Sequence, residues 1–232
     1  EGNVLVDADY SQIELRLLAH FSGCKVLVDA YKAGEDIHAA TAEKIFHVPL
    51  AQVTPDLRRR AKTINFGIIY GMSSFGLAKD LNCSNDEAQS YITAYFATHP
   101  EVKAYMDENV RRAKEDGFVT TILGRKRYIT ELKSSNYNQR SFGERAAMNM
   151  PLQGSAADII KIAMLRVADR LKRDGMRAKL VLQVHDELIL DAPEEEKEAA
   201  AALLKEEMEA AVQLNVPLIA EVSTGKSWYD AK

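Results

Sequence analysis

The feature that most constrains this chain is an acidic strand pattern near its start that turns directly into a helix pattern. Residues 4–16 read VLVDADYSQIELR, an apolar run ending at Asp7 and Asp9 and followed at once by helical spacing. A carboxylate at a strand end is held rigidly yet exposed, and hard cations such as Mg²⁺ bind carboxylate oxygens. The alternative is structural, because Ser11 and Glu14 have the spacing of a capping box at an ordinary helix start.

A second acidic segment lies near the other end of the chain. Residues 178–184 and 188–191 are apolar strand patterns joined by His185, Asp186 and Glu187. Short hairpins usually turn on Asn-Gly or Asp-Gly, so acids at this turn indicate a function, with a plain turn as the alternative. Paired in one sheet, Asp9 and Asp186 become candidate ligands for the two cations of a phosphoryl-transfer site.

The sequence between these strands is mostly helical, which predicts an α+β fold. Helices are expected from a capping box at Ser84 to before Pro100, from there to about Gly117, and from Ser155 to about Gly175. A hairpin is expected over 118–130 and an acidic amphipathic helix over 194–212, whose charged face we expect to be solvated. We therefore expect an antiparallel sheet that carries the carboxylates, with a large helical insertion.

One predicted helix carries a row of side chains that changes from cationic to aromatic along its length. Thr54 can cap it and Pro55 suits its first turn. Side chains four residues apart lie on one face of a helix, which aligns Arg58, Lys62, Phe66 and Tyr70. Two cations followed by two rings match a nucleoside triphosphate end to end, and Gly67 and Gly71 would let another surface approach closely. The alternative is a solvated basic patch at residues 58–60, with Phe66 in the core.

Three of these segments resemble the motifs of the A-family DNA polymerases, the bacterial DNA polymerase I family. They are residues 4–16, residues 58–71 (RRRAKTINFGIIYG) and residues 183–187 (QVHDE). Shorter similarities are DIH at 36–38, RAAMN at 145–149 and QGSAAD at 153–158. The resemblance covers the chain from Glu1 to Trp228. It implies a palm subdomain formed by residues 1–22 and 136–232 and a fingers subdomain formed by residues 23–135.

The resemblance also implies template-directed DNA synthesis, in which a primer 3′-hydroxyl attacks a dNTP and pyrophosphate leaves. Asp9 and Asp186 would bind two Mg²⁺ ions, with Glu187 supporting them and Lys62 as candidate proton donor. Nucleotide contacts are implied for Arg58, Lys62, Phe66, Tyr70, His38, Glu14 and Gln12. DNA contacts are implied for Arg145, Asn149, Gln153, His185 and Tyr70.

Two of these positions carry specific expectations by resemblance. Glu14 would exclude a ribose 2′-hydroxyl, a role that competes with its place in the capping box. Phe66 stands where other family members carry Tyr, which implies poor use of dideoxynucleotides.

The thumb, the opening of the palm and any exonuclease domain of the family have no counterpart in these residues. We therefore expect weak template-primer binding and little processivity unless a thumb-bearing N-terminal segment is supplied in cis or in trans. A nucleotide- or DNA-binding fragment without catalysis is the alternative. A two-metal nuclease is disfavoured, because it would not need the triphosphate-matching helix.

Composition is consistent with a DNA-binding cytoplasmic protein. The chain is 47% hydrophobic with a net charge of −4, but residues 191–209 alone carry −6, and basic residues gather at 58–62, 125–127, Arg140 and Arg145. Cys24 and Cys83 are far apart and indicate neither a zinc site nor a disulfide framework. No signal peptide or long apolar run is present. We expect a monomer in the cytoplasm, at the bacterial nucleoid, with no membrane partner.

Overall fold

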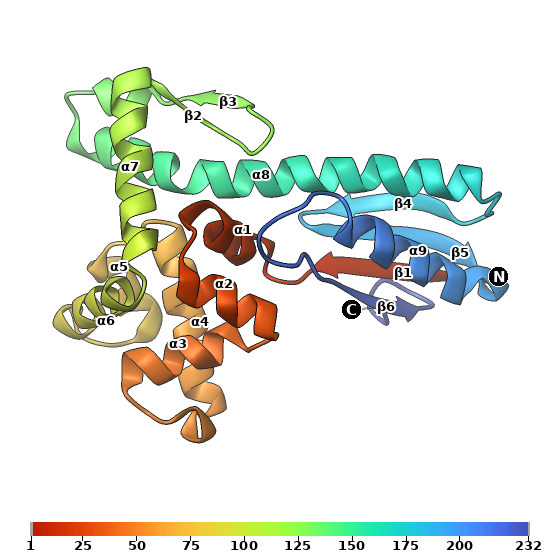
Figure 1. The fold of residues 1–232 in the computed structure, drawn as a ribbon, viewed down its shortest axis with the longest axis horizontal. Helices are drawn as coiled ribbons and strands as arrows, with labels where there is room; N and C mark the ends of the chain where they lie inside the picture. Colours follow the sequence, from red (N-terminus) through yellow and green to blue (C-terminus); the bar gives the residue numbers. More distant parts are fainter. Residues whose placement is uncertain (1, 232) are drawn as a thin grey trace. The chain divides into compact units, whose positions relative to one another are not determined.

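The computed structural model describes residues 2–231, which form two compact units (Figure 1). The sheet unit combines the residues up to Arg16 with those from Gly154 onward, and the helical unit is Leu17–Gln153. Figure 1 shows the red strand β1 among the blue C-terminal strands, so the two ends of the sequence build one sheet. The chain has the predicted α+β fold.

The sheet unit contains four antiparallel strands in the order β4-β5-β1-β6. Their bounds are Asn3–Tyr10 for β1, Lys179–Val184 for β4, Glu187–Pro193 for β5 and Ala220–Gly225 for β6. Alternate residues of β1, among them Val6 and Ala8, are fully buried, as expected for a strand with one face in a core. The helix α9, Lys197–Glu209, packs on β1, β5 and β6, and Tyr10 Oη donates to the Met208 carbonyl at 2.6 Å.

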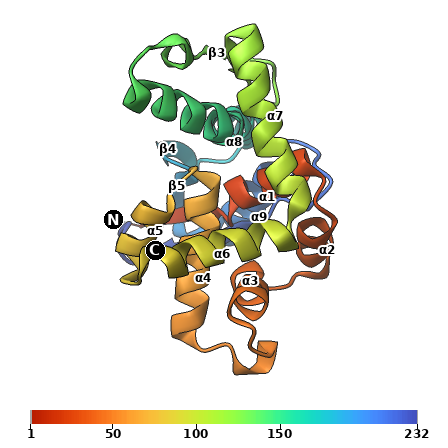
Figure 2. The same ribbon diagram turned by 90° about the vertical axis from the view of Figure 1, so that its left-hand side faces the viewer.

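The helical unit contains the predicted insertion. Its helices and strands are α2 Lys25–Ala33, α3 Ile37–Phe46, α4 Pro55–Ile69, α5 Ser74–Leu81, α6 Asn85–Thr98, α7 Pro100–Asp116, β2 Phe118–Thr120 and β3 Lys126–Tyr128, with the short 3-10 helices η1 Leu50–Gln52 and η2 Thr130–Lys133. Two helices run from one unit into the other, α1 Ile13–Ser22 and α8 Tyr137–Arg173. Figure 2 shows α3, α4 and α6 side by side, and they contact one another.

Local sequence signals placed most of these elements correctly. Ser84 Oγ accepts from the Glu87 amide at 3.1 Å at the start of α6, and Thr54 Oγ1 accepts from the Leu57 amide at 3.3 Å at the start of α4. The helix α7 stops at Gly117, whose φ of +81° suits glycine. The hairpin β2–β3 lies within residues 118–130 as predicted.

The long helix was predicted too short. It begins at Tyr137 instead of Ser155, with Pro151 inside it. Asn136 caps this start, because its Oδ1 accepts from the amides of Asn138 at 2.8 Å and Gln139 at 3.4 Å. The end near Gly175 was predicted correctly, since the helix stops at Arg173 and Gly175 has a φ of +66°.

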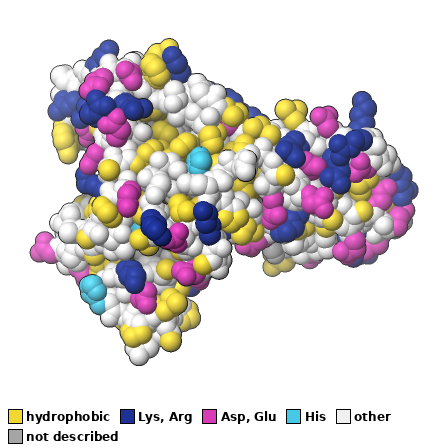
Figure 3. Space-filling model, viewed as in Figure 1, with side chains coloured by type: hydrophobic (Ala, Val, Ile, Leu, Met, Phe, Trp, Pro, Cys, Tyr) yellow, Lys and Arg dark blue, Asp and Glu magenta, His cyan; other side chains and the backbone are white. Residues whose placement is uncertain are grey.

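The acidic segment is also different from expectation. Its helix comprises the 3-10 turn η3, Glu194–Glu196, and α9, so it ends at Glu209 and not at 212. Glu207 is buried and bonded to Arg166 Nε at 2.8 Å and Arg170 Nη1 at 2.9 Å. Dark blue and magenta side chains are interleaved at the right-hand end of Figure 3, where α8 ends and η3 begins. The charged face is therefore partly neutralised by arginines from α8.

No helix among residues 2–231 is both long enough and apolar enough to cross a membrane. Both cysteines are free thiols, with Cys24 buried and Cys83 partly exposed.

Candidate active site

The sheet brings the predicted acidic residues to one end of neighbouring strands. Asp9 lies opposite Glu187 in the antiparallel register of β1 and β5. The Tyr10 amide donates to the Asp186 carbonyl at 3.1 Å, so the backbone of Asp186 adjoins the end of β1. Asp9 is exposed and Asp186 is half-buried. The two ends of the sequence therefore meet where the acids lie.

The turn that carries Asp186 has an unusual backbone. Val184 pairs with Glu187, which leaves His185 and Asp186 as a two-residue turn, so Glu187 belongs to β5 and not to the turn. His185 has a φ of +51°, and a residue with a Cβ pays about 1–2 kcal/mol there. Gln183 Nε2 donates to the His185 carbonyl at 2.7 Å, and this side-chain bond stabilises the turn. Strained backbone of this kind tends to occur at functional sites.

The side chain of Glu187 is held by Trp228, a residue near the C-terminus. It is only 5% exposed, and Trp228 Nε1 donates to its Oε1 at 2.6 Å. On the other side of β1, Glu221 of β6 lies opposite Asp9. Sequence reasoning assigned no role to Trp228 or Glu221, and no local signal could have done so, because both contacts depend on strand order.

The acids fit a magnesium site that shares its ion with a substrate. Within residues 2–231, no three His, Cys, Asp or Glu side chains cluster closely enough to hold a metal ion by themselves. Mg²⁺ commonly takes only one or two protein carboxylates and completes its shell with water and substrate phosphate. Asp9 and Asp186, whose backbones adjoin, are the candidates for these carboxylates.

The start of α1 does not have the capping-box geometry. The Arg16 amide donates to the Gln12 carbonyl at 3.0 Å, so the N-cap position is Gln12 and not Ser11. Gln12 has a φ of +56°, which is another strained position close to the acids in sequence. Glu14 is then the second helical residue, one place short of the position that a capping box requires. Both side chains are half-buried.

The predicted row on α4 is present. Arg58 and Lys62 are exposed, and Phe66 and Tyr70 are half-buried with their rings stacked at 6.2 Å. The opposite face of α4 is buried, with Ile64, Ile68 and Ile69 nearly inaccessible to solvent. The row is therefore on the accessible face, and the interpretation of Phe66 as a fully buried core residue is not supported. Within residues 2–231 Lys62 forms no ion pair.

Arg58 is tied to the neighbouring helix. Its Nε donates to Asp36 Oδ2 at 2.5 Å, and Asp36 Oδ1 accepts from the amides of His38 and Ala39 at the start of α3. Partial burial alone would raise the pKa of Asp36, but Arg58 and the two amides outweigh it and hold that pKa below its usual value. The carboxylate thus positions the guanidinium beside α3.

His38 is a buried residue whose ring lies next to Phe66 of this row. It is 2% exposed, its ring centre is 6.0 Å from that of Phe66, and its Nδ1 is 2.9 Å from Asn65 Nδ2. Burial, with Arg58 and Lys62 nearby, lowers the pKa of His38 to about 4, although Asp36 opposes the shift. The imidazole is neutral at pH 7. Sequence reasoning did not select Asn65, which is fully buried in the same helix.

The predicted DNA contacts on α8 lie four residues apart. Arg145, Asn149 and Gln153 therefore share one face, and Arg145 and Gln153 are exposed. A Cβ on Gly71 would stand 3.1 Å from Arg145 Cγ, so the close approach expected at Gly71 is confirmed. A Cβ on Gly67 would stand 3.4 Å from Leu77 Cδ1, an ordinary van der Waals distance, so no unusually close approach occurs there. Asn149 Oδ1 is a buried acceptor without a partner among residues 2–231.

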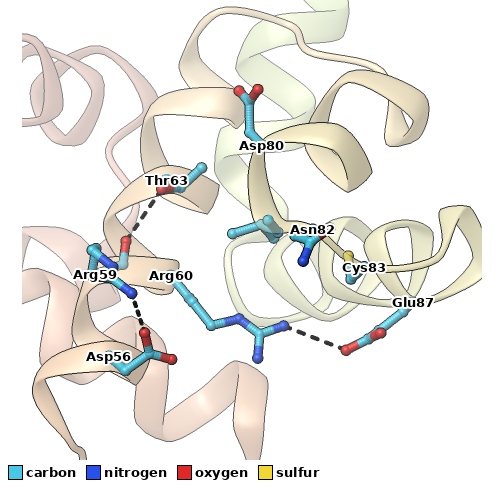
Figure 4. Close-up of a pocket in the computed structure, with 9 residues that line it drawn as sticks. Asp56, Arg59, Arg60, Thr63, Asp80, Asn82, Cys83 and Glu87 are labelled. Atoms are coloured by element: carbon cyan, nitrogen blue, oxygen red, sulfur yellow. Dashed lines mark hydrogen bonds and ion pairs between the residues drawn. The ribbon is translucent and has the colours of Figure 1, made fainter.

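A separate hollow of about 580 Å³ lies beside α4 and contains none of the predicted site residues (Figure 4). It is lined from α4 by Asp56, Arg59, Arg60 and Thr63 and from the α5–α6 region by Asp80, Leu81, Asn82, Cys83 and Glu87. Figure 4 shows Arg60 reaching across it to Glu87. Opposite charges line the same hollow, so it has no clear preference for an anion or a cation.

Carboxylates at strand ends are a feature that metal-dependent phosphoryl-transfer sites use. The chain belongs to DNA polymerase family A, whose family model matches residues 1–230. It is 52% identical over 231 residues to DNA polymerase I of Caldicellulosiruptor bescii, and 54% identical over 225 residues to that of Geobacillus stearothermophilus. These matches cover 100% and 97% of this chain but 27% and 26% of the relatives, so the chain spans about a quarter of their length.

A solved structure is similar throughout the chain. It is the POL domain of Pol1 from M. smegmatis in complex with DNA primer-template and dNTP, with a TM-score of 0.95 and 46% identity. The match covers 100% of this chain and 41% of that one.

Proposed function

We propose that this chain forms the catalytic carboxylate site and the nucleotide-binding helix of a DNA-directed DNA polymerase. The observation that carries the proposal is the pairing of Asp9 with Glu187, with Asp186 in the adjoining turn. Family membership and the similarity to a domain solved with primer-template and dNTP support it. Residues 1–22 and 136–232 would be the palm and residues 23–135 the fingers.

Asp9 and Asp186 would hold two Mg²⁺ ions, which when bound lower the pKa of the primer 3′-hydroxyl and neutralise charge on the triphosphate. Glu187 would support the two ions electrostatically without binding them through Oε1, because Oε1 already accepts a hydrogen bond from Trp228. His185 would present its exposed imidazole to the primer-template from the strained turn.

The helix α4 would bind the incoming nucleotide. Arg58, Lys62 and His38 would contact its phosphates, and Lys62, which forms no ion pair within residues 2–231, is the candidate donor of a proton to pyrophosphate. Phe66 and Tyr70 would lie against sugar and base. From the sheet unit, Gln12 and Glu14 would also contact the nucleotide, Glu14 at the sugar, while Arg145, Asn149, Gln153 and Tyr70 would contact DNA.

Primer extension with Mg²⁺ tests this function. Asp186→Asn keeps the size of the side chain but removes the charge, and we expect extension to fall by about a thousandfold or more. Asp191→Asn is the matched control and should retain activity, because Asp191 lies further along β5 and its carboxylate accepts from Asn3 Nδ2 at 2.9 Å. Wild-type activity in Asp186→Asn would refute the assignment.

The assay should be run with and without the preceding region of a relative. Nucleotide binding without extension in both arms would favour the alternative, a nucleotide- or DNA-binding fragment without catalysis. Long, processive extension by these 232 residues alone would refute the expectation that a thumb-bearing segment is needed as a partner.

A further inference from the structure

The buried side chain of Asn65 connects α4 to His38 and Thr41 of α3 by hydrogen bonds. Its Nδ2 is 2.9 Å from His38 Nδ1 and 3.1 Å from Thr41 Oγ1, and Asn65 is completely inaccessible to solvent. An amide nitrogen has two protons and no acceptor lone pair. Two acceptors at hydrogen-bond distance therefore use both of its protons.

The Thr41 hydroxyl acts as an acceptor toward Asn65 Nδ2. Thr41 Oγ1 lies 2.7 Å from the Ile37 carbonyl and 3.2 Å from Asn65 Oδ1, and we assign its single proton to the shorter contact, which leaves a lone pair for Asn65 Nδ2 at 3.1 Å. With Nδ2 as the donor, the second amide proton points to His38 Nδ1. A neutral imidazole whose Nδ1 accepts a hydrogen bond carries its proton on Nε2.

The other ring nitrogen is available to a ligand. No hydrogen bond to His38 Nε2 is found among residues 2–231, and Nε2 is not one of the fully buried polar atoms that lack a partner, so it keeps a small accessible area although the residue as a whole is 2% exposed. The charged groups that face the ring are Asp36 from the start of α3 and Arg58 and Lys62 from α4. Burial, together with the two cations, lowers the pKa of His38 and keeps the ring neutral. The tautomer therefore decides whether Nε2 donates or accepts.

We propose that Asn65 is a positioning residue for nucleotide binding, which holds His38 in the Nε2–H tautomer so that the ring donates to a phosphate oxygen. This inference rests on the proposed function of α4. Phosphate oxygens only accept hydrogen bonds, so the opposite tautomer would turn a lone pair toward them and repel the ligand.

The tautomer can be measured by long-range ¹H–¹⁵N NMR of the whole chain labelled at histidine. His99 provides an internal reference, because its Nδ1 lies 3.0 Å from the Tyr95 carbonyl and must carry the proton there. We expect His38 as Nε2–H and His99 as Nδ1–H in the same spectrum at pH 7, with His38→Gln identifying the His38 signal. A His38 ring with its proton on Nδ1 would overturn the inference.

Asn65→Asp tests the consequence for binding. The new carboxylate only accepts, so His38 Nδ1 becomes protonated and Nε2 keeps a proton only while the ring is an imidazolium. Binding of dATP with Mg²⁺, measured by calorimetry, should then weaken relative to wild type as the pH rises, by about tenfold at the alkaline end. A loss that is the same at every pH would indicate a structural role only and would overturn the proposal.

His38→Gln supplies the matched background. The glutamine amide donates from near the Nε2 position at any pH, so Asn65→Asp on that background should leave the pH profile unchanged. An unaltered His99 signal in each variant shows that the protein is folded. Failure of wild type to bind dATP would overturn the proposed function together with this inference, whereas a wrong tautomer with normal primer extension would overturn the inference alone.

Discussion

Trp228 donates a hydrogen bond from its indole nitrogen to Oε1 of Glu187 at 2.6 Å, joining the C-terminal residues to the strand that follows the His185–Asp186 turn. Glu187 is 5% exposed, and a buried carboxylate is costly unless its oxygens accept hydrogen bonds. The indole therefore stabilises a charge directly opposite Asp9.

Trp228→Phe should lower the free energy of unfolding by about 1.5–3 kcal/mol, because a hydrogen bond to a charged, buried group is lost. Urea denaturation followed by circular dichroism measures it. In a Glu187→Gln background the same change should cost clearly less, since the acceptor is then neutral. Equal costs in both backgrounds would show that the bond to the charge contributes nothing.

His185→Gly should raise the free energy of unfolding by up to about 1 kcal/mol, because glycine tolerates the φ of +51° without the clash of a Cβ. His185→Ala removes the same imidazole but keeps the Cβ, so it should not stabilise. Thermal denaturation of the two variants separates the backbone effect from the side-chain effect. If alanine stabilises as much as glycine, backbone strain is not the cause.

Arg60→Ala should destabilise the helical unit by about 1–2 kcal/mol. Its guanidinium lies 5.4 Å from the centre of the Phe46 ring and 5.8 Å from that of Tyr91, and it pairs with Glu87 at 3.4 Å. Arg59→Ala is the control, because that neighbouring side chain is 77% exposed. Comparable losses of stability for the two variants in urea would contradict a linking role for Arg60.

Glu207→Gln should make the sheet unit less sensitive to acid. Burial alone would raise the pKa of Glu207, but Arg166 and Arg170 outweigh it and hold that pKa below its usual value. A carboxyl whose pKa is lowered on folding contributes stability above its unfolded pKa, about 4.5, and this contribution is lost as the pH falls through the folded value. Wild type should therefore lose more stability than Glu207→Gln between about pH 6 and pH 3.

Glu206→Gln is the control for that comparison, because this glutamate is 62% exposed and its contact with Arg170 Nη1 is long, at 3.4 Å. Its stability should follow the wild-type pH profile in thermal denaturation. A Glu207→Gln profile that also matches wild type would contradict the ion-pair assignment.

Local chemistry allowed much of the fold to be predicted from sequence. Side-chain caps at Thr54 and Ser84, and glycines at 117 and 175, act over a few residues, so helix ends could be located without tertiary information. The start of α8 lies well before the predicted Ser155, because Asn136 carries the capping bonds. The capping box expected at Ser11 is absent from α1, because Gln12, with a φ of +56°, takes the N-cap position.

The sequence by itself determined which residue types are available for chemistry and the order in which helices and strands follow one another. Periodicity placed Arg58, Lys62, Phe66 and Tyr70 on one helix face, because helical geometry alone sets that spacing. Only the tertiary structure decided that β1 lies between β5 and β6 and that Trp228 reaches Glu187. It likewise decided that α3 packs on α4, so that Asn65 reaches His38. Those contacts join residues far apart along the chain, and strand order and helix packing depend on the burial of the whole core rather than on any local pattern.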